Sequence, residues 1–342
     1  MELEPRTVSR RRLKGRSRIN IKKRIGISLI ILILLVGAGY LFRKELSLLA
    51  FNTLLKKDIK ETLDNSYKPF GYEIRNTHAY EGKPFSLLLM GIDQRDQEPS
   101  RSDTIIYSVI RPKDNKILLV SIPRDSYTEI IGRDVKSKIN SAYAHGGEKM
   151  SMDTVASLLK NRVDYYATVN FKGVIDIVDA IGGVKLPITK VIENKNPKHE
   201  KLRIEPNQPM YDGLDALSYV RYREDSDFKR TERQRIFIRA VTNKILDFKN
   251  VAKVPELIDI AGSNFTTNMD PDLILKLAET VYLNDTPPDF EKHMLQGRGK
   301  TRGTTWYYDL DAEDLEYTQK LISNWLNSDI NKQDLIHPQD MD

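Results

Sequence analysis

The chain carries the run Phe85-Ser-Leu-Leu-Leu-Met90 immediately before Gly91, and a short apolar run that ends in this way is typical of a buried β-strand. Residues 104–110 and 116–122 form two further runs that are rich in β-branched and aliphatic side chains. Between them lies Arg111-Pro-Lys-Asp-Asn115, whose proline, aspartate and asparagine are typical of a turn. The two runs are therefore predicted to pair as an antiparallel hairpin.

Helical patterns alternate with strands along the rest of the chain. Residues 171–181 place valine and isoleucine at helical spacing, and Gly182-Gly183 follows them as a helix end. The remaining predicted elements are helices at 151–161 and 231–248, strands at 165–169 and 305–308, and two or three helices after residue 251. This order of elements predicts an α/β fold with a mixed sheet in a single large domain.

The positive net charge of the chain, +6, is concentrated at its N-terminus. Residues 1–24 contain ten Lys or Arg and two Glu, whereas residues 43–342 contain 44 basic and 46 acidic side chains. The body of the protein is therefore close to neutral, and this distribution argues against nucleic acid as its partner.

Residues 25–42 form an uncharged, mostly apolar segment. A helix of this length is roughly 27 Å long and matches the hydrocarbon core of a bilayer. A cleaved signal peptide is the alternative, but no small-residue cleavage site follows the segment. The basic residues 1–24 predict a cytoplasmic N-terminus, a single-pass anchor and a body outside the cell membrane. Residues 43–84 are expected to form a stalk helix, over 43–66, and a linker.

Several familiar chemistries are excluded by the composition. The chain has no cysteine, so it has neither disulfides nor a thiol nucleophile, and a large exterior domain without disulfides suggests a Gram-positive bacterium. It also lacks a Walker P-loop, a G-x-S-x-G elbow and an H-E-x-x-H motif. The histidines at 78, 145, 198, 293 and 337 are too far apart in sequence to suggest a metal site.

Basic side chains cluster in the seventeen residues from Tyr219 to Arg235, which contain six basic and four acidic residues. Arg221 and Arg223 would share one face of an extended strand, and Arg230 and Gln234 would share one face of a helix. Guanidinium groups match phosphate oxygens in geometry, so the segment suggests a phosphate or pyrophosphate site. A solvated basic helix is the alternative interpretation.

The predicted hairpin brings a second set of side chains together. Asp93 follows the first strand, Asp103 opens the second, and Arg124 follows the third, so antiparallel pairing places all three at one edge of the sheet. Carboxylates and an arginine at one place suit a divalent cation that holds a phosphorylated substrate. A salt bridge at the strand ends, or aspartates that cap turns, would account for the same residues without a function.

Seven motifs in a fixed order resemble the LytR-CpsA-Psr family of membrane-anchored phosphotransferases. The similarity spans about residues 85–245. The motifs are Leu89-Met-Gly-Ile-Asp93, Arg101-Ser-Asp-Thr104, Ser121-Ile-Pro-Arg-Asp-Ser126, Lys138-Ile-Asn-Ser-Ala-Tyr143, Val178-Asp-Ala-Ile-Gly-Gly-Val184, Asp212-Gly-Leu-Asp-Ala-Leu-Ser-Tyr-Val-Arg-Tyr-Arg223, and Asp227-Phe-Lys-Arg230 with Arg233-Gln234.

The resemblance implies an α/β/α domain whose apolar interior holds a polyprenyl chain and whose polar mouth binds its pyrophosphate. Asp93 and Asp103 would hold Mg²⁺ (or Mn²⁺). The pyrophosphate oxygens would be bound by Arg124, Arg221, Arg223, Arg230 and Gln234.

Two further site residues follow from the resemblance. Arg101 would orient Asp103, and Asp227 would either orient an arginine or help to deprotonate the acceptor hydroxyl. Lys229 departs from the family, which often has glycine in the turn between Asp227 and Arg230.

The implied reaction transfers an anionic glycopolymer, such as wall teichoic acid, from undecaprenyl pyrophosphate to peptidoglycan through a new phosphodiester. The extracytoplasmic catalytic domain would span residues 85–327, with a C-terminal tail at 328–342. Two alternatives use the same features: a membrane-anchored regulator that binds polyprenyl lipids and attenuates transcription, and a pyrophosphatase that hydrolyses the lipid diphosphate.

Overall fold

The computed structural model describes residues 60, 63–70, 77–95, 98–196, 201–225, 227–245, 264–283 and 286–338. The chain divides into two compact units, Met1–Thr53 and Leu54–Asp342, and every described residue belongs to the second. The predicted membrane segment at 25–42 and most of the predicted stalk lie outside the described residues. Within the described ranges, no helix has both the length and the apolar character needed to cross a membrane.

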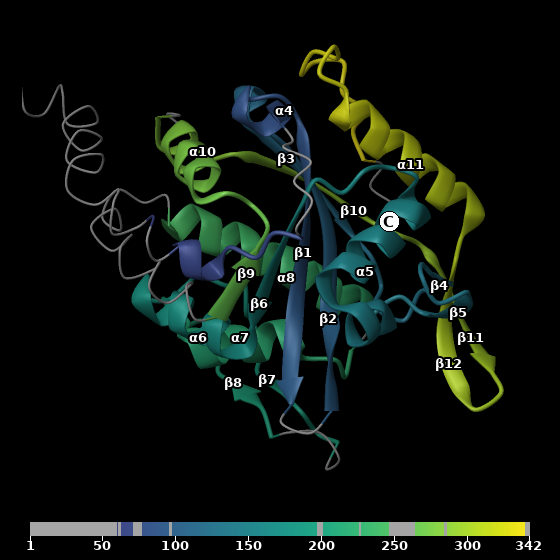
Figure 1. The fold of residues 1–342 in the computed structure, drawn as a ribbon. Helices are drawn as coiled ribbons and strands as arrows, with labels where there is room; N and C mark the ends of the chain where they lie inside the picture. The colour runs from purple at the N-terminus through teal and green to yellow at the C-terminus, as the bar shows by residue number, and fades with distance from the viewer. Residues whose placement is uncertain are drawn as a thin grey trace, which may run out of the picture. The chain divides into compact units, whose positions relative to one another are not determined.

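A six-stranded sheet forms the centre of the second unit (Figure 1). Its order is β10-β3-β2-β1-β6-β9. The strands are β1 (Phe85–Arg95), β2 (Glu98–Arg111), β3 (Lys116–Ser121), β6 (Tyr165–Asn170), β9 (Phe265–Thr267) and β10 (Asp289–Met294). Because β1 pairs antiparallel with β2 but parallel with β6, the sheet is mixed, as the sequence predicted.

The predicted hairpin is confirmed, because β2 and β3 pair antiparallel around a single helical turn at Pro112–Asp114. Asn115 closes this turn with a φ of 53°, in the left-handed region that asparagine tolerates. The prediction that the first strand ends at Gly91 was wrong. Its pairing with β2 continues to Arg95 and Glu98, so a two-stranded ribbon extends beyond the rest of the sheet.

The alternation of side chains along the strands creates two buried faces. Leu88, Met90, Tyr107 and Val120 belong to one hydrophobic cluster with α5 (Ser141–Leu159) and α11 (Ala312–Leu326). On the opposite face the sheet is covered by α6 (Phe171–Ala180), α7 (Gly213–Arg221) and α8 (Asp227–Ile245), and α8 passes behind β1 and β2 in Figure 1. The result is the α/β/α arrangement that the resemblance implied.

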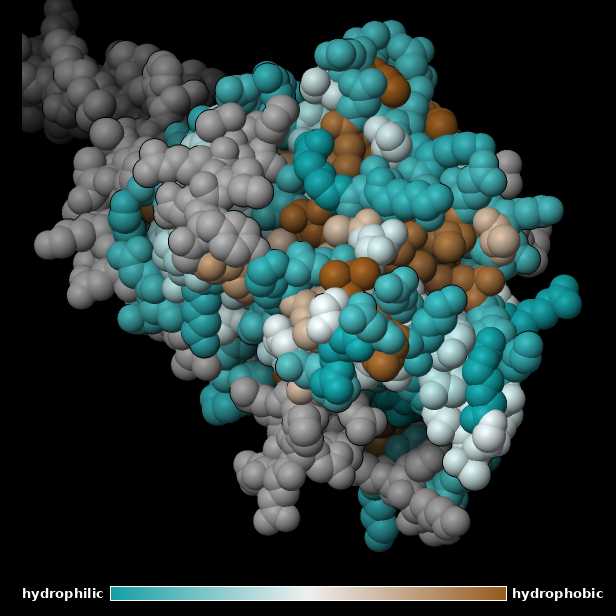
Figure 2. Space-filling model, turned by 45° about the vertical axis from the view of Figure 1, so that its right-hand side comes forward, coloured by the Kyte–Doolittle hydropathy of each residue, from teal (hydrophilic) through white to brown (hydrophobic). Residues whose placement is uncertain are grey.

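The face of the molecule in Figure 2 shows mainly hydrophilic residues, with hydrophobic ones in small groups between them. This distribution agrees with the burial of large apolar side chains in two clusters, one between the sheet and helices α5 and α11 and the other among α6, α7, α8 and the segments that join them.

Some helices begin or end at other residues than the sequence predicted. The first begins at Ser141 rather than at residue 151, and its backbone is broken at Gly146 and Gly147, where Gly147 has a φ of 61°. Helix α6 ends as predicted, because Gly182 and Gly183 both have positive φ values. Two of the helices predicted after residue 251 are described, α10 (Pro271–Leu283) and α11.

Short elements surround the sheet. A single turn of helix, α4, covers Thr77–Tyr80. Three small hairpins were not predicted as pairs, although one strand had been placed at 305–308. They are β4 (Tyr127–Ile130) with β5 (Val135–Lys138), β7 (Ile192–Glu193) with β8 (Arg203–Ile204), and β11 (Gly297–Arg302) with β12 (Thr305–Leu310).

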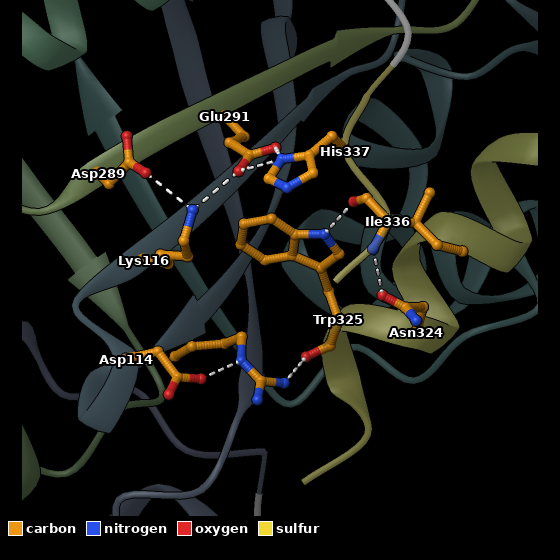
Figure 3. A network of polar contacts seen from close by, with 9 residues as sticks. Asp114, Lys116, Asp289, Glu291, Asn324, Trp325, Ile336 and His337 are labelled. Carbon is orange, nitrogen blue, oxygen red and sulfur yellow. Dashed lines mark hydrogen bonds and ion pairs between the residues drawn. The ribbon is translucent and has the colours of Figure 1, made fainter. Parts of the chain in front are cut away.

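The buried side chain of Arg111 joins the C-terminal segment to the end of α11 through hydrogen bonds. Arg111 is 4% exposed, and its guanidinium donates to the backbone oxygens of Trp325 at 2.7 Å, Asn327 at 3.0 Å and Ile330 at 2.6 Å. The Trp325 indole in turn donates to the oxygen of Ile336 at 2.8 Å (Figure 3). Carbonyls that a helix end leaves unsatisfied thus find their donors in a side chain from β2.

Candidate functional site

A β-bulge places Asp103 at the functional edge of the sheet. Gly91 pairs with Thr104, but the next residue of β1, Ile92, pairs with Ser102, so Asp103 is an extra residue in β2. A bulge of this kind bends its strand and changes the direction in which a side chain points. Asp103 and Thr104 consequently line the same two pockets, although they are adjacent in a strand.

Arg124 reaches Asp103 from the turn that follows β3. The turn is closed by two hydrogen bonds from Ser126 to the oxygen of Pro123, from its backbone nitrogen at 3.0 Å and its hydroxyl at 2.6 Å. Arg124 Nη1 contacts Asp103 Oδ1, and its Nε lies 3.4 Å from Asp125 Oδ2. Lys138 Nζ lies 2.7 Å from the other oxygen of Asp125. The predicted meeting of Asp103 and Arg124 at one edge is therefore confirmed.

Arg221 and Arg223 were predicted to share one face of an extended strand, and this prediction was wrong. They do not share a strand, because Arg221 is the last residue of α7, whose N-cap Asp212 accepts a hydrogen bond from the Asp215 nitrogen at 2.9 Å. Arg223 follows the helix, and its Nη2 lies 3.1 Å from Asp103 Oδ2. The guanidinium of Arg221 is stacked on Phe171, 4.5 Å from the ring centroid.

Arg230 and Gln234 lie one turn apart on α8, and both line the same two pockets, as the helical spacing predicted. Both side chains are buried, and Arg230 Nη2 donates to the backbone oxygen of Asp103 at 2.9 Å. Arg124, Arg223 and Arg230 therefore converge on one aspartate from three separate elements.

The electrostatics of Asp103 follow from this convergence. Burial by itself would raise the pKa of the Asp103 carboxyl, but the positive charges of Arg124, Arg230 and Arg223 outweigh that effect and lower the pKa below its usual value. The carboxylate is thus ionised at neutral pH and contacts the guanidinium groups of Arg124 and Arg223. Such a cluster of guanidinium groups is suited to a ligand with several negative charges.

For Asp93, Arg101 and Asp227 the structure describes the backbone. Asp93 and Arg101 are directly paired across β1 and β2, two residues from Asp103, and Asp227 is the first residue of α8. The roles predicted for these three side chains remain predictions.

The described carboxylates offer few ligands for a magnesium ion. Among the described residues, no group of three or more His, Cys, Asp or Glu is placed to hold a metal. Asp103 nevertheless supplies an ionised carboxylate beside arginines that suit phosphate. Mg²⁺ is commonly held by one or two carboxylates and completed by substrate oxygens and water, so the donor set fits a cation that arrives with its substrate.

Two pockets of the described residues meet at this cluster and share Asp103, Thr104, Arg230 and Gln234. The first, which we term the apolar pocket, lies between the sheet and α6, α7 and α8. Its wall includes Leu89, Ile106, Val174, Leu217, Phe237 and Ile238. The second, which we term the polar pocket, adds Arg124, Asp125, Thr231, Trp306 and Tyr308. The charged residues thus lie where the apolar pocket borders a pocket whose wall mixes charged, polar and apolar side chains.

Three residues that contribute to this site were not predicted as site residues from the sequence. Arg233 is buried in α8, and its guanidinium binds both oxygens of Asp225, at 2.7 and 2.9 Å, and the backbone oxygen of Tyr222 at 2.7 Å. It thereby fixes the loop that carries Arg223. Trp306 and Tyr308 come from a hairpin distant in sequence, and the aromatic run Trp306-Tyr-Tyr308 was the signal that could have identified them.

The described part of the chain thus combines an α/β/α fold with a cluster of arginines around Asp103 that borders an apolar pocket. Residues 51–324 match the LytR_cpsA_psr family, and the chain belongs to this family.

Named relatives indicate what this family does elsewhere. The chain is 33% identical over 304 residues to the polyisoprenyl-teichoic acid–peptidoglycan teichoic acid transferase TagU of Bacillus subtilis (strain 168), which covers 87% of this chain and 94% of that protein. It is 30% identical over 310 residues to the transferase of the same name from Enterococcus faecalis, with 89% and 96% coverage. A structure described as TagT bound to LI-WTA aligns with a TM-score of 0.59 at 27% identity, over 74% of this chain and 94% of that chain.

Proposed function

We propose that the protein is a phosphotransferase that moves an anionic glycopolymer of the wall teichoic acid type from undecaprenyl pyrophosphate to peptidoglycan. The observation that carries this proposal is the convergence of Arg124, Arg223 and Arg230 on Asp103 at the mouth of the apolar pocket. The names of the relatives support the same donor and acceptor classes.

The lipid-linked donor combines an apolar chain with a charged pyrophosphate, and the apolar pocket and the arginines beside it suit these two parts. An isoprenoid chain is apolar and would be buried among the side chains of α6, α7 and α8 that line the apolar pocket. Its pyrophosphate would then lie at the shared boundary, where Arg221, Arg223 and Arg230 offer guanidinium donors and Gln234 offers an amide. Arg124 would reach the same phosphates from the opposite side of Asp103.

The proposed step exchanges one phosphorus–oxygen bond for another. The acceptor hydroxyl oxygen attacks the phosphorus that bears the sugar, the bond from this phosphorus to the bridging oxygen breaks, and polyprenyl phosphate leaves while the hydroxyl loses its proton. Such a reaction requires in-line positioning and charge stabilisation rather than a covalent nucleophile on the protein. The arginines would neutralise charge on the transferred and leaving groups. Asp227 would orient an arginine or accept the proton.

Mg²⁺ (or Mn²⁺), when bound, would supply further charge neutralisation at the phosphate oxygens, with Asp103 and Asp93 as the residues that hold it. For the arrangement of the chain relative to the membrane, we propose what the sequence predicts. Residues 1–24 would be cytoplasmic, residues 25–42 would cross the membrane of a Gram-positive cell, and residues 85–327 would act at its outer surface, where donor lipid and wall meet.

A transfer assay with the full chain in detergent, lipid-linked donor, glycan acceptor and Mg²⁺ tests the proposal. Arg230→Ala should lower transfer by about a hundredfold or more, as expected when a principal donor to a reacting phosphate is removed. Arg239, exposed on the same helix, gives the matched control Arg239→Ala, which should keep full activity. Free sugar phosphate as the sole product, even with acceptor present, would identify a pyrophosphatase instead.

A further inference from the structure

The β11–β12 hairpin presents an exposed aromatic surface beside Asp103, Arg124, Arg223 and Arg230, which we term the phosphate cluster after its proposed ligand. Trp306 is 42% exposed, and it lines the polar pocket together with Tyr308, Arg124 and Arg230. Trp306 and Tyr308 are two residues apart in one strand, so their side chains share a face of the hairpin. Their rings lie 6.4 Å apart between centroids. The indole therefore offers a solvent-accessible aromatic face at the wall of this pocket.

Two glycines in the opposite strand make room for these rings. A Cβ atom at Gly299 would lie 2.9 Å from Nε1 of Trp306. A Cβ atom at Gly297 would lie 2.1 Å from the backbone oxygen of Asp309 and 2.9 Å from Cε1 of Tyr308. Gly299 pairs directly with Tyr308, and Gly297 with Leu310. Because β11 has no side chains at these positions, both rings can lie low over the backbone of β11. The aromatic groups therefore form a shelf along the hairpin.

The shelf is held in position relative to Arg124. The Tyr308 nitrogen donates to the oxygen of Asp125 at 2.9 Å, and Tyr308 forms a β-bridge with Ser126, so β12 is joined to the turn that carries Arg124. On the opposite face of β12, Tyr307 packs edge-on against Tyr127 at 4.9 Å. Figure 1 shows the hairpin, in yellow, beside β4 and β5. The phosphate cluster and the aromatic shelf thus belong to one connected unit.

We propose that Trp306 and Tyr308 form a stacking surface for the sugar ring that is joined to the donor's pyrophosphate, an inference that rests on the proposed function. The C–H-rich face of a pyranose is apolar, and it packs on the face of an aromatic ring while the hydroxyl groups remain solvated. The two pockets share the residues of the phosphate cluster, so a group that is bonded to the phosphates opposite the lipid enters the polar pocket. The shelf lies in this pocket.

The inference is tested first by fluorescence of the full chain in detergent. The chain has two tryptophans, and Trp325 is fully buried, so quenching by acrylamide reports mainly on Trp306. Polyprenyl pyrophosphate that carries an N-acetylhexosamine disaccharide should protect Trp306 from quenching. The same lipid pyrophosphate without sugar should leave quenching unchanged. Equal protection by both lipids, or protection by neither, would overturn the inference.

Binding of the same two probes to variants gives the second test. Trp306→Ala should weaken binding of the sugar-bearing lipid about three- to tenfold, which corresponds to roughly 0.7–1.4 kcal/mol, and should leave the sugar-free lipid unaffected. Trp306→Tyr should restore most of the affinity. Gly299→Ala, which displaces the indole, should resemble Trp306→Ala. Leu214 is 63% exposed on α7, and Leu214→Ala serves as the control.

Other outcomes separate this inference from the function on which it rests. Equal loss for both lipids in Trp306→Ala would mean that the indole only supports the phosphate cluster. An increased KM for the glycan acceptor, with unchanged donor binding, would assign the shelf to the acceptor. Either result overturns the inference and leaves the transferase proposal intact. If Arg230→Ala binds both lipids as the wild type does, the proposed function itself is contradicted.

Discussion

The guanidinium of Arg124, in the turn after β3, contacts the carboxylate of Asp103, the extra residue of the bulge in β2. Arg223 contacts the second oxygen of the same carboxylate, and Arg230 donates to the backbone oxygen of the same residue. Asp103 thus fixes the positions of three guanidinium groups before a substrate binds. A phosphorylated ligand that enters the site exchanges contacts with arginines whose positions are already fixed, which lowers the entropic cost of binding.

Neutralising Asp103 should change the pH dependence of stability. The pKa of the Asp103 carboxyl is lower in the folded state than in the unfolded chain, so ionisation favours the folded state. This contribution is fully present above the unfolded pKa of about 3.9 and is lost as pH falls through the lower folded value. Asp103→Asn should therefore be less stable than the wild type at pH 7, and the difference should shrink towards pH 2–3. Urea unfolding curves of both proteins across this range measure it.

A difference in unfolding free energy that stays constant from pH 7 to pH 2 would contradict the linkage. Arg298 is exposed on β11, and Arg298→Gln should show no pH-dependent difference, which controls for general effects of net charge.

Removal of divalent cations should abolish transfer if the cation is held as proposed. EDTA should eliminate activity of the full chain, Mg²⁺ should restore it, and Mn²⁺ should substitute, because both ions accept carboxylate and phosphate oxygens. In Asp103→Ala the Mg²⁺ concentration for half-maximal activity should rise at least tenfold. Full activity in EDTA-treated, metal-free protein would show that the arginines alone stabilise the transferred group.

Arg233 should act on the site through position rather than through contact with substrate. Arg233→Ala removes the bonds to Asp225 and to the Tyr222 oxygen, which hold the loop that precedes α8. Because Arg233 is buried whereas Asp225 is exposed, the loss of these hydrogen bonds should cost about 1–3 kcal/mol of stability. Because Arg223 lies in this loop, KM for the lipid-linked donor should rise about tenfold while kcat falls less. Arg233→Lys, which keeps the charge but not the fork, should recover stability better than KM.

Equal losses of kcat and donor binding in Arg233→Ala would instead indicate a direct role for this guanidinium in the reaction. Steady-state kinetics well below the unfolding temperature distinguish the two outcomes.

The features that the sequence predicted correctly are those that local geometry determines. The hairpin follows from turn residues at 112–115. The position of Arg230 and Gln234 on one face of α8 follows from the period of a helix. The prediction for Arg221 failed because α7 extends through this residue. Asp212 and Asp215 carried the signal, since an N-cap aspartate followed by a helix-compatible run predicts a helix start.

Other features depend on contacts between distant segments. The bulge that isolates Asp103 is a matter of strand register, which no composition rule specifies for a single residue. Trp306 reaches the site because Tyr308 bridges to Ser126, 182 residues earlier in the numbering. Neither contact has a local pattern from which it could be inferred.

Arg111 should be essential for stability and dispensable for binding. Its guanidinium supplies hydrogen bonds to the backbone oxygens of Trp325, Asn327 and Ile330, at the opposite end of β2 from Asp103. Arg111→Ala leaves these carbonyls without their donor and should cost about 3–5 kcal/mol in the free energy of unfolding.

Trp325→Phe loses one hydrogen bond, to Ile336 (Figure 3), and should cost about 1–2 kcal/mol. Thermal unfolding followed by near-ultraviolet circular dichroism measures both. Donor KM at a temperature where each variant remains folded should match the wild type, and a raised KM would mean that the C-terminal segment communicates with the phosphate cluster through β2.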